Sequence, residues 1–191
     1  MRGVRLETER LVVRDLPPGA ARAVARFHRE NWDFHRRWEP LRTHDYFTPR
    51  VQRRILRAER RADGIVHLWM LLSGAARGRA EIVGSVSVSS IVRGFFQSCF
   101  LGHKVDARYA RQGYTREALV AVLDYVFSEL GLHRVEANVM PANEASQALL
   151  RSLGFREEGR SRAYLRIQGV WEDHLHFVML EERWHKNRIR P

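Results

Sequence analysis

The order of the hydrophobic patterns changes near residue 110, and this change constrains the fold more than any other feature of the chain. Before it, three apolar or alternating runs at 65–72, 82–88 and 95–105 follow one another, as the strands of a sheet do. After it, a helical pattern over 115–130 leads into a short strand at 134–139, which forms a parallel crossover unit. The sequence therefore predicts a mixed α/β (α+β) fold.

The other elements follow from capping and turn residues. Thr48 and Pro49 suit the N-cap and the first position of a helix that ends before Gly64. Gly131 and Gly154 are placed to end two later helices. The remaining predicted elements are a strand at 11–14, helices at 20–29 and 145–153, a turn over Gly74–Arg79, and a final pair of strands at 155–167 and 175–181.

Length and composition set broad limits. With 191 residues and no linker-like stretch, we expect one domain over residues 1–191. No apolar run approaches the roughly 18 residues of a membrane span, and the first residues lack the apolar core of a signal peptide. We therefore expect a cytoplasmic protein without membrane association. The one cysteine, Cys99, fits a small core residue, so we predict neither a disulfide nor a metal site.

The net charge of +11 suits a polyanionic partner. Nucleic acid, a ribosome surface, an acidic protein and a phosphate-bearing cofactor all fit this charge. Lysine occurs only at Lys104 and Lys186, so the arginine content equally fits the base composition of the genome. Charge alone therefore identifies no partner.

The segment between the strand ending at 105 and the helix at 115–130 predicts an anion site. A loop that meets a helix N-terminus leaves several backbone N–H groups unpaired, and the helix dipole adds to their attraction for phosphate. Gly113 lets the backbone approach a ligand closely. Arg111 or Arg116 would add charge-assisted hydrogen bonds. One glycine in such a turn is common, so the loop alone does not establish phosphate binding.

Four polar residues farther along have both a structural and a functional interpretation. Asn143 stands at a helix start and fits a plain N-cap, while Ser146 one turn later fits local backbone bonding. Glu136 and Asn138 are two residues apart on a strand, so both project from one face, toward solvent or toward a ligand.

Short motifs occur in a fixed order along nearly the whole chain. They are Thr8–Arg14, Trp38–Pro40, Val92–Phe95, Leu101–Gly102, Glu117–Leu119, Met140–Asn143, Leu153–Gly159 and Gly169–His174. Their order and spacing resemble the GNAT superfamily of acetyltransferases and, within it, the RimJ-type ribosomal-protein-alanine N-acetyltransferases. The resemblance implies a GNAT fold: a twisted, mostly antiparallel mixed sheet of about seven strands with helices on both faces. It also implies that the parallel strands Phe100–Val105 and Arg134–Val139 splay apart to admit acetyl-CoA.

The resemblance also implies where the cofactor binds. The pantetheine arm of acetyl-CoA would bind backbone near Val105, and Asn143 would contact this arm from the far side. The pyrophosphate would lie on the N–H groups of Arg111, Gln112, Gly113, Tyr114, Thr115 and Arg116. The family loop reads Gln/Arg-x-x-Gly-x-Gly/Ala. Here Ala110 and Thr115 replace its first and last positions, and Arg111 stands where this branch usually has glycine; Thr115 would cap the helix.

The mechanism implied by the resemblance is direct attack of a neutral amine on the thioester within a ternary complex. Ser146 matches the serine proposed as the general acid in RimL-type enzymes. Glu136 is the first candidate for the general base, Glu39 the second, and Asp173 or His174 the third; for the last two, a hydrogen-bonded structural pair in the final hairpin is the slightly favoured interpretation.

The residues predicted to bind the acceptor are Trp38, Asn138, Tyr164 and Asp173. The aromatic side chains of Trp32, Phe34, Trp38 and Tyr164 would form the walls of the acceptor groove or, equally, pack helices on the sheet.

Three functions remain open. The first, favoured by Trp38–Pro40 and Val92–Phe95, is acetylation of the N-terminal amine of a ribosomal protein that begins with Ala or Ser. The second is acetylation of a small amine such as an amino acid, polyamine or antibiotic, because the fold does not determine the acceptor. The third is a non-catalytic RNA- or ribosome-binding protein, which the altered loop would favour, although the sequence shows no aromatic-basic RNA-binding signature. Ribosome association through a basic surface is compatible with the charge.

Overall fold

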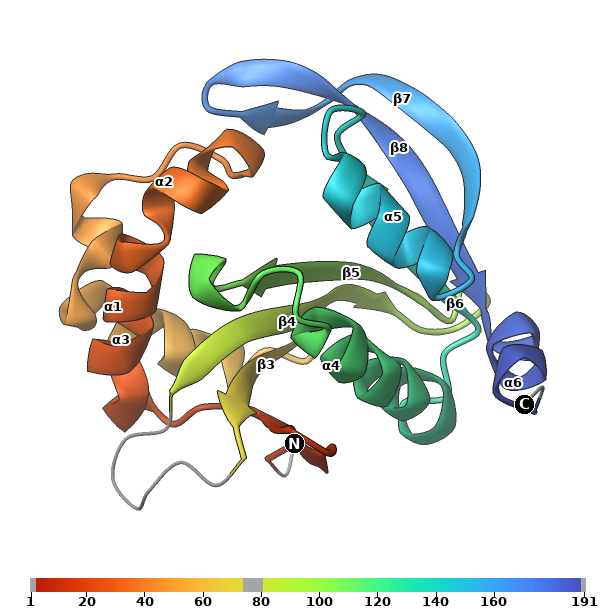
Figure 1. Ribbon diagram of the computed structural model, residues 1–191, viewed down its shortest axis with the longest axis horizontal. Helices are drawn as coiled ribbons and strands as arrows, with labels where there is room; N and C mark the ends of the chain where they lie inside the picture. Colours follow the sequence, from red (N-terminus) through yellow and green to blue (C-terminus); the bar gives the residue numbers. More distant parts are fainter. Residues whose placement is uncertain (1–2, 74–80, 190–191) are drawn as a thin grey trace.

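The computed structural model describes residues 3–73 and 81–189, and its centre is one sheet of eight strands in the order β1-β2-β3-β4-β5-β6-β8-β7 (Figure 1). Neighbouring strands are antiparallel except β5 and β6. The predicted turn Gly74–Arg79 lies outside the described residues. The strands are β1 (Arg5–Glu7), β2 (Leu11–Arg14), β3 (Ile65–Leu72), β4 (Ile82–Val92), β5 (Ser98–Val105), β6 (Arg134–Val139), β7 (Arg156–Ile167) and β8 (Val170–Leu180).

The helices lie on both faces of this sheet (Figure 1). The α-helices are α1 (Ala21–Glu30), α2 (Trp32–His35), α3 (Pro49–Glu59), α4 (Tyr114–Asp124), α5 (Glu144–Ser152) and α6 (Glu181–Ile189). A π-helical segment, η5 (Tyr125–Glu129), continues α4. Short 3-10 segments are η1 (Pro18–Ala20), η2 (Arg36–Trp38), η3 (His44–Phe47) and η4 (Ala107–Tyr109). Within the described residues, no helix is long and apolar enough to span a membrane.

Strand β3 explains why helices cover both faces. Its side chains alternate between two apolar clusters, so the strand is buried from both sides. Leu68 and Met70 belong to the core beneath α4 and α5. Trp69 and Leu71 belong to a second cluster with α1 and α3. The near-continuous apolar run that predicted a central strand is this doubly buried strand.

The sheet confirms the predicted mixed fold, but two strands begin elsewhere than expected. Strand β5 begins at Ser98 and not at residue 95, because Gly94 and Phe95 form a turn, and β8 begins at Val170 and not at residue 175.

Two further elements, at the two ends of the chain, were not expected. Strand β1 was not expected: its three residues include one apolar side chain, Leu6, and it adds an eighth strand beside β2. Helix α6 was also not expected. It is anchored by Trp184, which is 3% exposed, packs against Phe127 and donates its indole N–H to Asp124 Oδ1 at 2.8 Å.

The implied splay of the parallel strands is confirmed by the register. Strands β5 and β6 pair only at their first residues, from Ser98 opposite Arg134 to Phe100 opposite Glu136. From Leu101 to Val105, β5 has no strand partner on that side among the described residues, while β6 continues along β8 to Val139. The two strands therefore open toward their carboxyl ends.

Candidate active site at the opening between β5 and β6

The edge of β5 presents backbone groups to the opening. Asp106 N–H donates to Val83 O at 2.7 Å, which sets the alternation of the antiparallel ladder with β4. Lys104 therefore bonds to β4, whereas the backbone of His103 and Val105 faces the opening. The Val105 carbonyl already accepts a hydrogen bond from His35 Nε2 at 2.8 Å. Near the predicted position Val105, His103 is thus the residue whose backbone is placed to meet a ligand.

The start of α4 has the backbone geometry that an anion site requires. Gly113 is the N-cap residue with φ +84°, and the first helical bond runs from Glu117 N–H to the Gly113 carbonyl at 3.0 Å. The N–H groups of Tyr114, Thr115 and Arg116 consequently have no partner within the helix. Thr115 is the second helical residue, so the expectation that it caps the helix is wrong; the cap residue is Gly113, with no side-chain bond.

A partly buried network of hydrogen bonds holds this loop in place. Glu117 Oε1 accepts from Thr8 Oγ1 at 2.6 Å and from Arg10 N–H at 2.8 Å, and Glu117 Oε2 pairs with Arg10 Nε at 2.7 Å. Arg10 also donates to the Gln112 carbonyl at 3.1 Å and lies over the ring of Tyr114. Burial opposes ionisation of Glu117, but these hydrogen bonds outweigh it and lower its pKa. Sequence reasoning noted the motifs that contain these residues but did not connect them.

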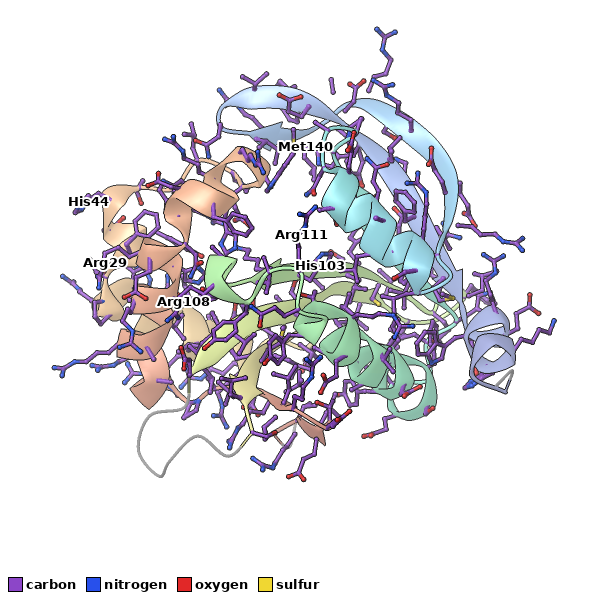
Figure 2. All side chains as sticks on the ribbon, in the orientation of Figure 1. Arg29, His44, His103, Arg108, Arg111 and Met140 are labelled. Atoms are coloured by element: carbon purple, nitrogen blue, oxygen red, sulfur yellow. The ribbon has the colours of Figure 1, made fainter. Side chains whose placement is uncertain are left out.

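Helix α5 forms the facing wall. Asn143 Oδ1 accepts from Ser146 N–H at 3.2 Å, so Asn143 is the N-cap, as its structural interpretation predicted. Ser146 Oγ lies 3.4 Å from His103 Nε2 across the opening. Burial lowers the pKa of His103 to about 4, so its ring is neutral near pH 7. In Figure 2, His103 and Arg111 lie at the centre of the molecule, between α4 and α5.

His103 was missed by sequence reasoning, although a signal for it existed. Cys99 and Leu101 face the core beneath α4, so His103 occupies the next position on an apolar strand face. A histidine there needs a polar neighbour or a ligand. Cys99 itself is 3% exposed, and burial raises its pKa to about 12, which keeps the thiol protonated as expected of a core residue.

A second polar cluster lies on the opposite face of the sheet. Val135, Ala137 and Val139 of β6 face the core, so Glu136 and Asn138 project from the other side, as predicted.

His176 of β8 joins these two residues: its Nδ1 bonds to Asn138 Oδ1 and lies 3.3 Å from Glu136 Oε1. Its Nε2 is 2.7 Å from Ser161 Oγ of β7, and its ring lies 5.0 Å from that of Tyr164. Because Nδ1 faces two acceptors, it carries the proton, and Nε2 accepts from the serine hydroxyl. His176 and Ser161 were not singled out from the sequence.

Glu39 forms ion pairs with two cations, one of which, Lys104, comes from β5. Its carboxylate meets Lys104 Nζ at 2.7 Å and Arg42 Nη2 at 3.1 Å. Burial raises the pKa of Glu39, but the two cations outweigh this effect and lower it. The Glu39 carbonyl also accepts from Gln168 Nε2 at 2.9 Å, which ties the segment after η2 to the β7–β8 hairpin. Trp38, just before it, is half-buried beneath the guanidinium of Arg37.

Asp173 is not brought together with Glu136. It accepts from Ala163 N–H at 2.8 Å and pairs with Arg160 at 2.6 Å, which pins a bulge of β7 where Ala163 has φ +48°. Its neighbour His174 bonds through Nδ1 to the Glu172 carbonyl at 3.1 Å. The two residues therefore do not form the structural pair that was considered, because adjacent strand residues point to opposite faces.

The candidate site thus combines the N-terminus of α4, an open strand pair and polar clusters on both faces of the sheet. Residues 10–156 match the family model of the acetyltransferase (GNAT) domain, and the chain belongs to this family. GNAT enzymes use acetyl-CoA, so the protein is an acetyl-CoA-dependent N-acetyltransferase.

Its relatives point to one branch of the family. The chain is 35% identical to the [Ribosomal protein uS5]-alanine N-acetyltransferase of Escherichia coli (strain K12) over 97% of this chain and 95% of the relative. The crystal structure of ribosomal-protein-S5-alanine acetyltransferase from Vibrio fischeri is similar, with a TM-score of 0.85 and 30% identity, covering 95% of this chain and 98% of that one. Mycobacterium smegmatis RimJ in complex with CoA-disulfide has a TM-score of 0.84 and 28% identity over 94% of this chain and 87% of that one.

Proposed function

We propose that the protein acetylates the N-terminal amine of a ribosomal protein that begins with Ala or Ser, in the cytoplasm where such proteins are made. The names of the Escherichia coli and Vibrio fischeri relatives support this acceptor. The observation that carries the proposal is the position of the Glu136–His176 cluster. It lies beside the opening, on the sheet face opposite Ser146 and His103, so an amine and a thioester can approach from different sides.

The residues present fit acetyl-CoA. The free N–H groups at Tyr114, Thr115 and Arg116 suit its pyrophosphate, and a side chain at Gly113 would meet Arg10 Nη2 at 3.3 Å, so the cradle is shaped for close approach. The amides of the pantetheine arm would form hydrogen bonds with the backbone of His103, in place of the strand partner that β5 lacks on this side. When bound, acetyl-CoA supplies the thioester whose acetyl group passes to the amine.

On the sheet face that carries Glu136 and His176, we propose that this pair takes up the proton that the attacking amine loses. Ser161 Oγ–H donates to His176 Nε2, so a proton taken up through this hydroxyl arrives at Nε2. The imidazolium that results is stabilised by the Glu136 carboxylate 3.3 Å from Nδ1. Asn138 Oδ1 holds the ring in the tautomer that leaves Nε2 free to accept. In this proposal the general base is Glu136 acting through His176, and Glu39 has a structural role in its ion pairs with Lys104 and Arg42.

On the opposite sheet face, beside His103, the hydroxyl of Ser146 would donate a proton to the departing CoA thiolate. Its hydroxyl can donate only one hydrogen bond, so the contact with His103 decides where that bond points. A neutral His103 that donates its Nε2–H to Ser146 Oγ leaves the serine hydrogen free to donate to the thiolate.

The test is a steady-state acetylation assay with peptides. We expect Ala- and Ser-initiated peptides to be acetylated and the same peptides with a blocked N-terminus to be inert. Glu136→Gln and His176→Asn should each lower kcat by about a hundredfold with little change in acetyl-CoA affinity. Ser146→Ala should lower kcat more than it weakens acetyl-CoA binding. A preference for spermidine or free amino acids over the peptides would instead assign a small-amine acceptor.

A further inference from the structure

The outer helical layer carries a concentrated positive charge. Helices α1 and α3 pack side by side (Figure 1). Their exposed side chains are dominated by arginine. The arginines on these two helices, all exposed, are Arg22, Arg26, Arg29, Arg50, Arg53, Arg54 and Arg57. We call this set the arginine face.

The arginine face lacks the counter-charges found elsewhere in the molecule. Other arginines pair with carboxylates, as Arg108 does with Asp106 at 2.9 Å. No member of the arginine face forms an ion pair with any residue in 3–73 or 81–189. The two acidic residues on these helices are Glu30 and Glu59, and Glu59 is held by His67 at 2.9 Å. Uncompensated arginines on adjacent helices create a strong local positive potential.

A pocket with aromatic walls adjoins the arginine face. It has a volume of about 500 Å³ and is lined by Arg29, Trp32, Arg42, His44, Phe47 and Thr48. It lies where α1 ends and α3 begins, because Arg29 is in the last turn of α1 and Thr48 is the N-cap of α3. The rings of Trp32 and Phe47 pack edge to face, with their centroids 5.1 Å apart. Trp32, predicted from the sequence to lie in the wall of the acceptor groove or in helix packing, lines this separate pocket.

The pocket lies on another side of the molecule from the acetylation site, although Arg42 both lines the pocket and pairs with Glu39. In Figure 2, Arg29 and His44 lie on the outer side of the helical layer, whereas His103 and Arg111 lie at the centre of the molecule. A ligand on the arginine face would therefore leave the opening between β5 and β6 accessible.

We propose that the arginine face and its pocket bind RNA, with phosphates along the arginines and one unpaired base in the pocket. Guanidinium groups form charge-assisted, bidentate bonds with phosphate. Aromatic side chains beside cationic ones are the features that hold splayed bases of single-stranded RNA. Trp32 and Phe47 supply the aromatic surface, and Arg29, Arg42 and His44 the polar rim. The sequence showed no such signature because Trp32 and Phe47 meet only in the fold. This property goes beyond acetyl transfer and does not depend on it.

The test is fluorescence anisotropy of a labelled single-stranded RNA and of a duplex RNA of equal length, each measured over a series of salt concentrations. Three variants are compared with the natural protein. They are Arg53→Glu/Arg57→Glu on the arginine face, His44→Ala at the rim of the pocket, and Arg156→Glu/Arg162→Glu on the exposed side of β7 as the matched charge control.

We expect single-stranded RNA to bind more tightly than duplex. The Arg53→Glu/Arg57→Glu variant should weaken both, and should lower the slope of log K against log salt by about 1.4, since each phosphate contact contributes about 0.7 for single strands. The charge control should retain the affinity. His44→Ala should reduce the preference for single strands by about fivefold while leaving duplex binding unchanged. Acetylation of a free peptide by the Arg53→Glu/Arg57→Glu variant should be unchanged, which verifies its fold.

Equal loss of RNA affinity in the Arg53→Glu/Arg57→Glu variant and the charge control would overturn the proposal, because binding would then reflect net charge only. Competition by poly-glutamate as effective as that by RNA would also overturn it and assign the face to an acidic protein. Either result would leave the acetylation assay, and the function proposed above, unaffected.

Discussion

At the scale of single residues, two backbone conformations decide the shape of the cofactor loop. Gly113 has φ +84°, a conformation that glycine adopts at no steric cost. Arg111 has φ +63°, which costs a residue with a side chain about 1 kcal/mol. It stands where this branch of the family usually has glycine, so the loop keeps the left-handed turn and gains a cation facing the opening.

Replacing Gly113 with alanine tests this shape. The new methyl group would be strained by the positive φ and would press on Arg10 Nη2 at 3.3 Å, so we expect acetyl-CoA affinity to fall by about tenfold in calorimetric titration. Gly131→Ala is the matched control: its φ is +60°, but no atom lies within 4 Å of the added group. Both variants should lose about 1 kcal/mol of stability. Unchanged acetyl-CoA affinity in Gly113→Ala would remove the loop from the cofactor site.

At the scale of elements, the turn between β1 and β2 supports the start of α4. Thr8 and Arg10 come from that turn and Glu117 from the first turn of the helix, and the side chain of Glu117 is 17% exposed. A largely buried carboxylate with three hydrogen-bond donors stabilises the fold more than a surface ion pair does, because removing the carboxylate leaves those donors unsatisfied. This contact joins the Thr8–Arg14 and Glu117–Leu119 motifs in the folded protein.

We expect Glu117→Ala to lower the free energy of unfolding by about 2 kcal/mol in urea titration and to weaken acetyl-CoA binding, because Arg10 then loses its anchor. Glu129→Ala is the control, since Glu129 is exposed at the far end of the same helical segment. A loss of stability without any loss of cofactor affinity would show that the network supports the sheet and not the loop.

At the scale of the whole molecule, buried neutral histidines make stability depend on pH. Burial lowers the pKa of His28 to about 2 and of His103 to about 4, and it also lowers the pKa of His35. In the unfolded chain these rings have a pKa near 6.5, so below that pH the unfolded state binds more protons than the folded one. Stability is therefore highest above about pH 6.5 and falls as the pH drops toward 4. Glu39 and Glu117, whose pKa values are lowered, add their own loss only below about pH 4.5.

Urea unfolding at about pH 7.5 and about pH 5 checks this behaviour, because that interval isolates the histidines from the carboxylates. We expect the free energy of unfolding to be lower at the acid end, with about 2 kcal/mol of the difference coming from His28 alone. His28→Phe, which keeps a ring in the aromatic cluster with Trp69, should reduce the difference by that amount. A pH dependence identical to that of the natural protein would show that His28 does not contribute.

Much of the fold could be predicted because its signals are local. The doubly apolar run of β3, the cap formed by Thr48 and Pro49, and the helical face of α4 each depend on neighbouring residues, and each was predicted close to its observed bounds. Strand β1 and helix α6 were missed because Leu6 and Trp184 gain their apolar contacts from distant segments. A short polar element has no periodic pattern of its own.

The sequence by itself determined the family, the order of elements and the loop that meets α4, because these follow from spacing along the chain. Only the tertiary structure decided which side chains meet: Ser146 with His103, Glu136 with His176 and Ser161, and Glu117 with Arg10. These contacts join residues far apart in the chain. The Glu136–His176–Ser161 contacts depend on the register of β6 with β8 and of β8 with β7. Register is set by the packing of whole sheet faces, so a shift of one residue would turn His176 away from Glu136 and into the core.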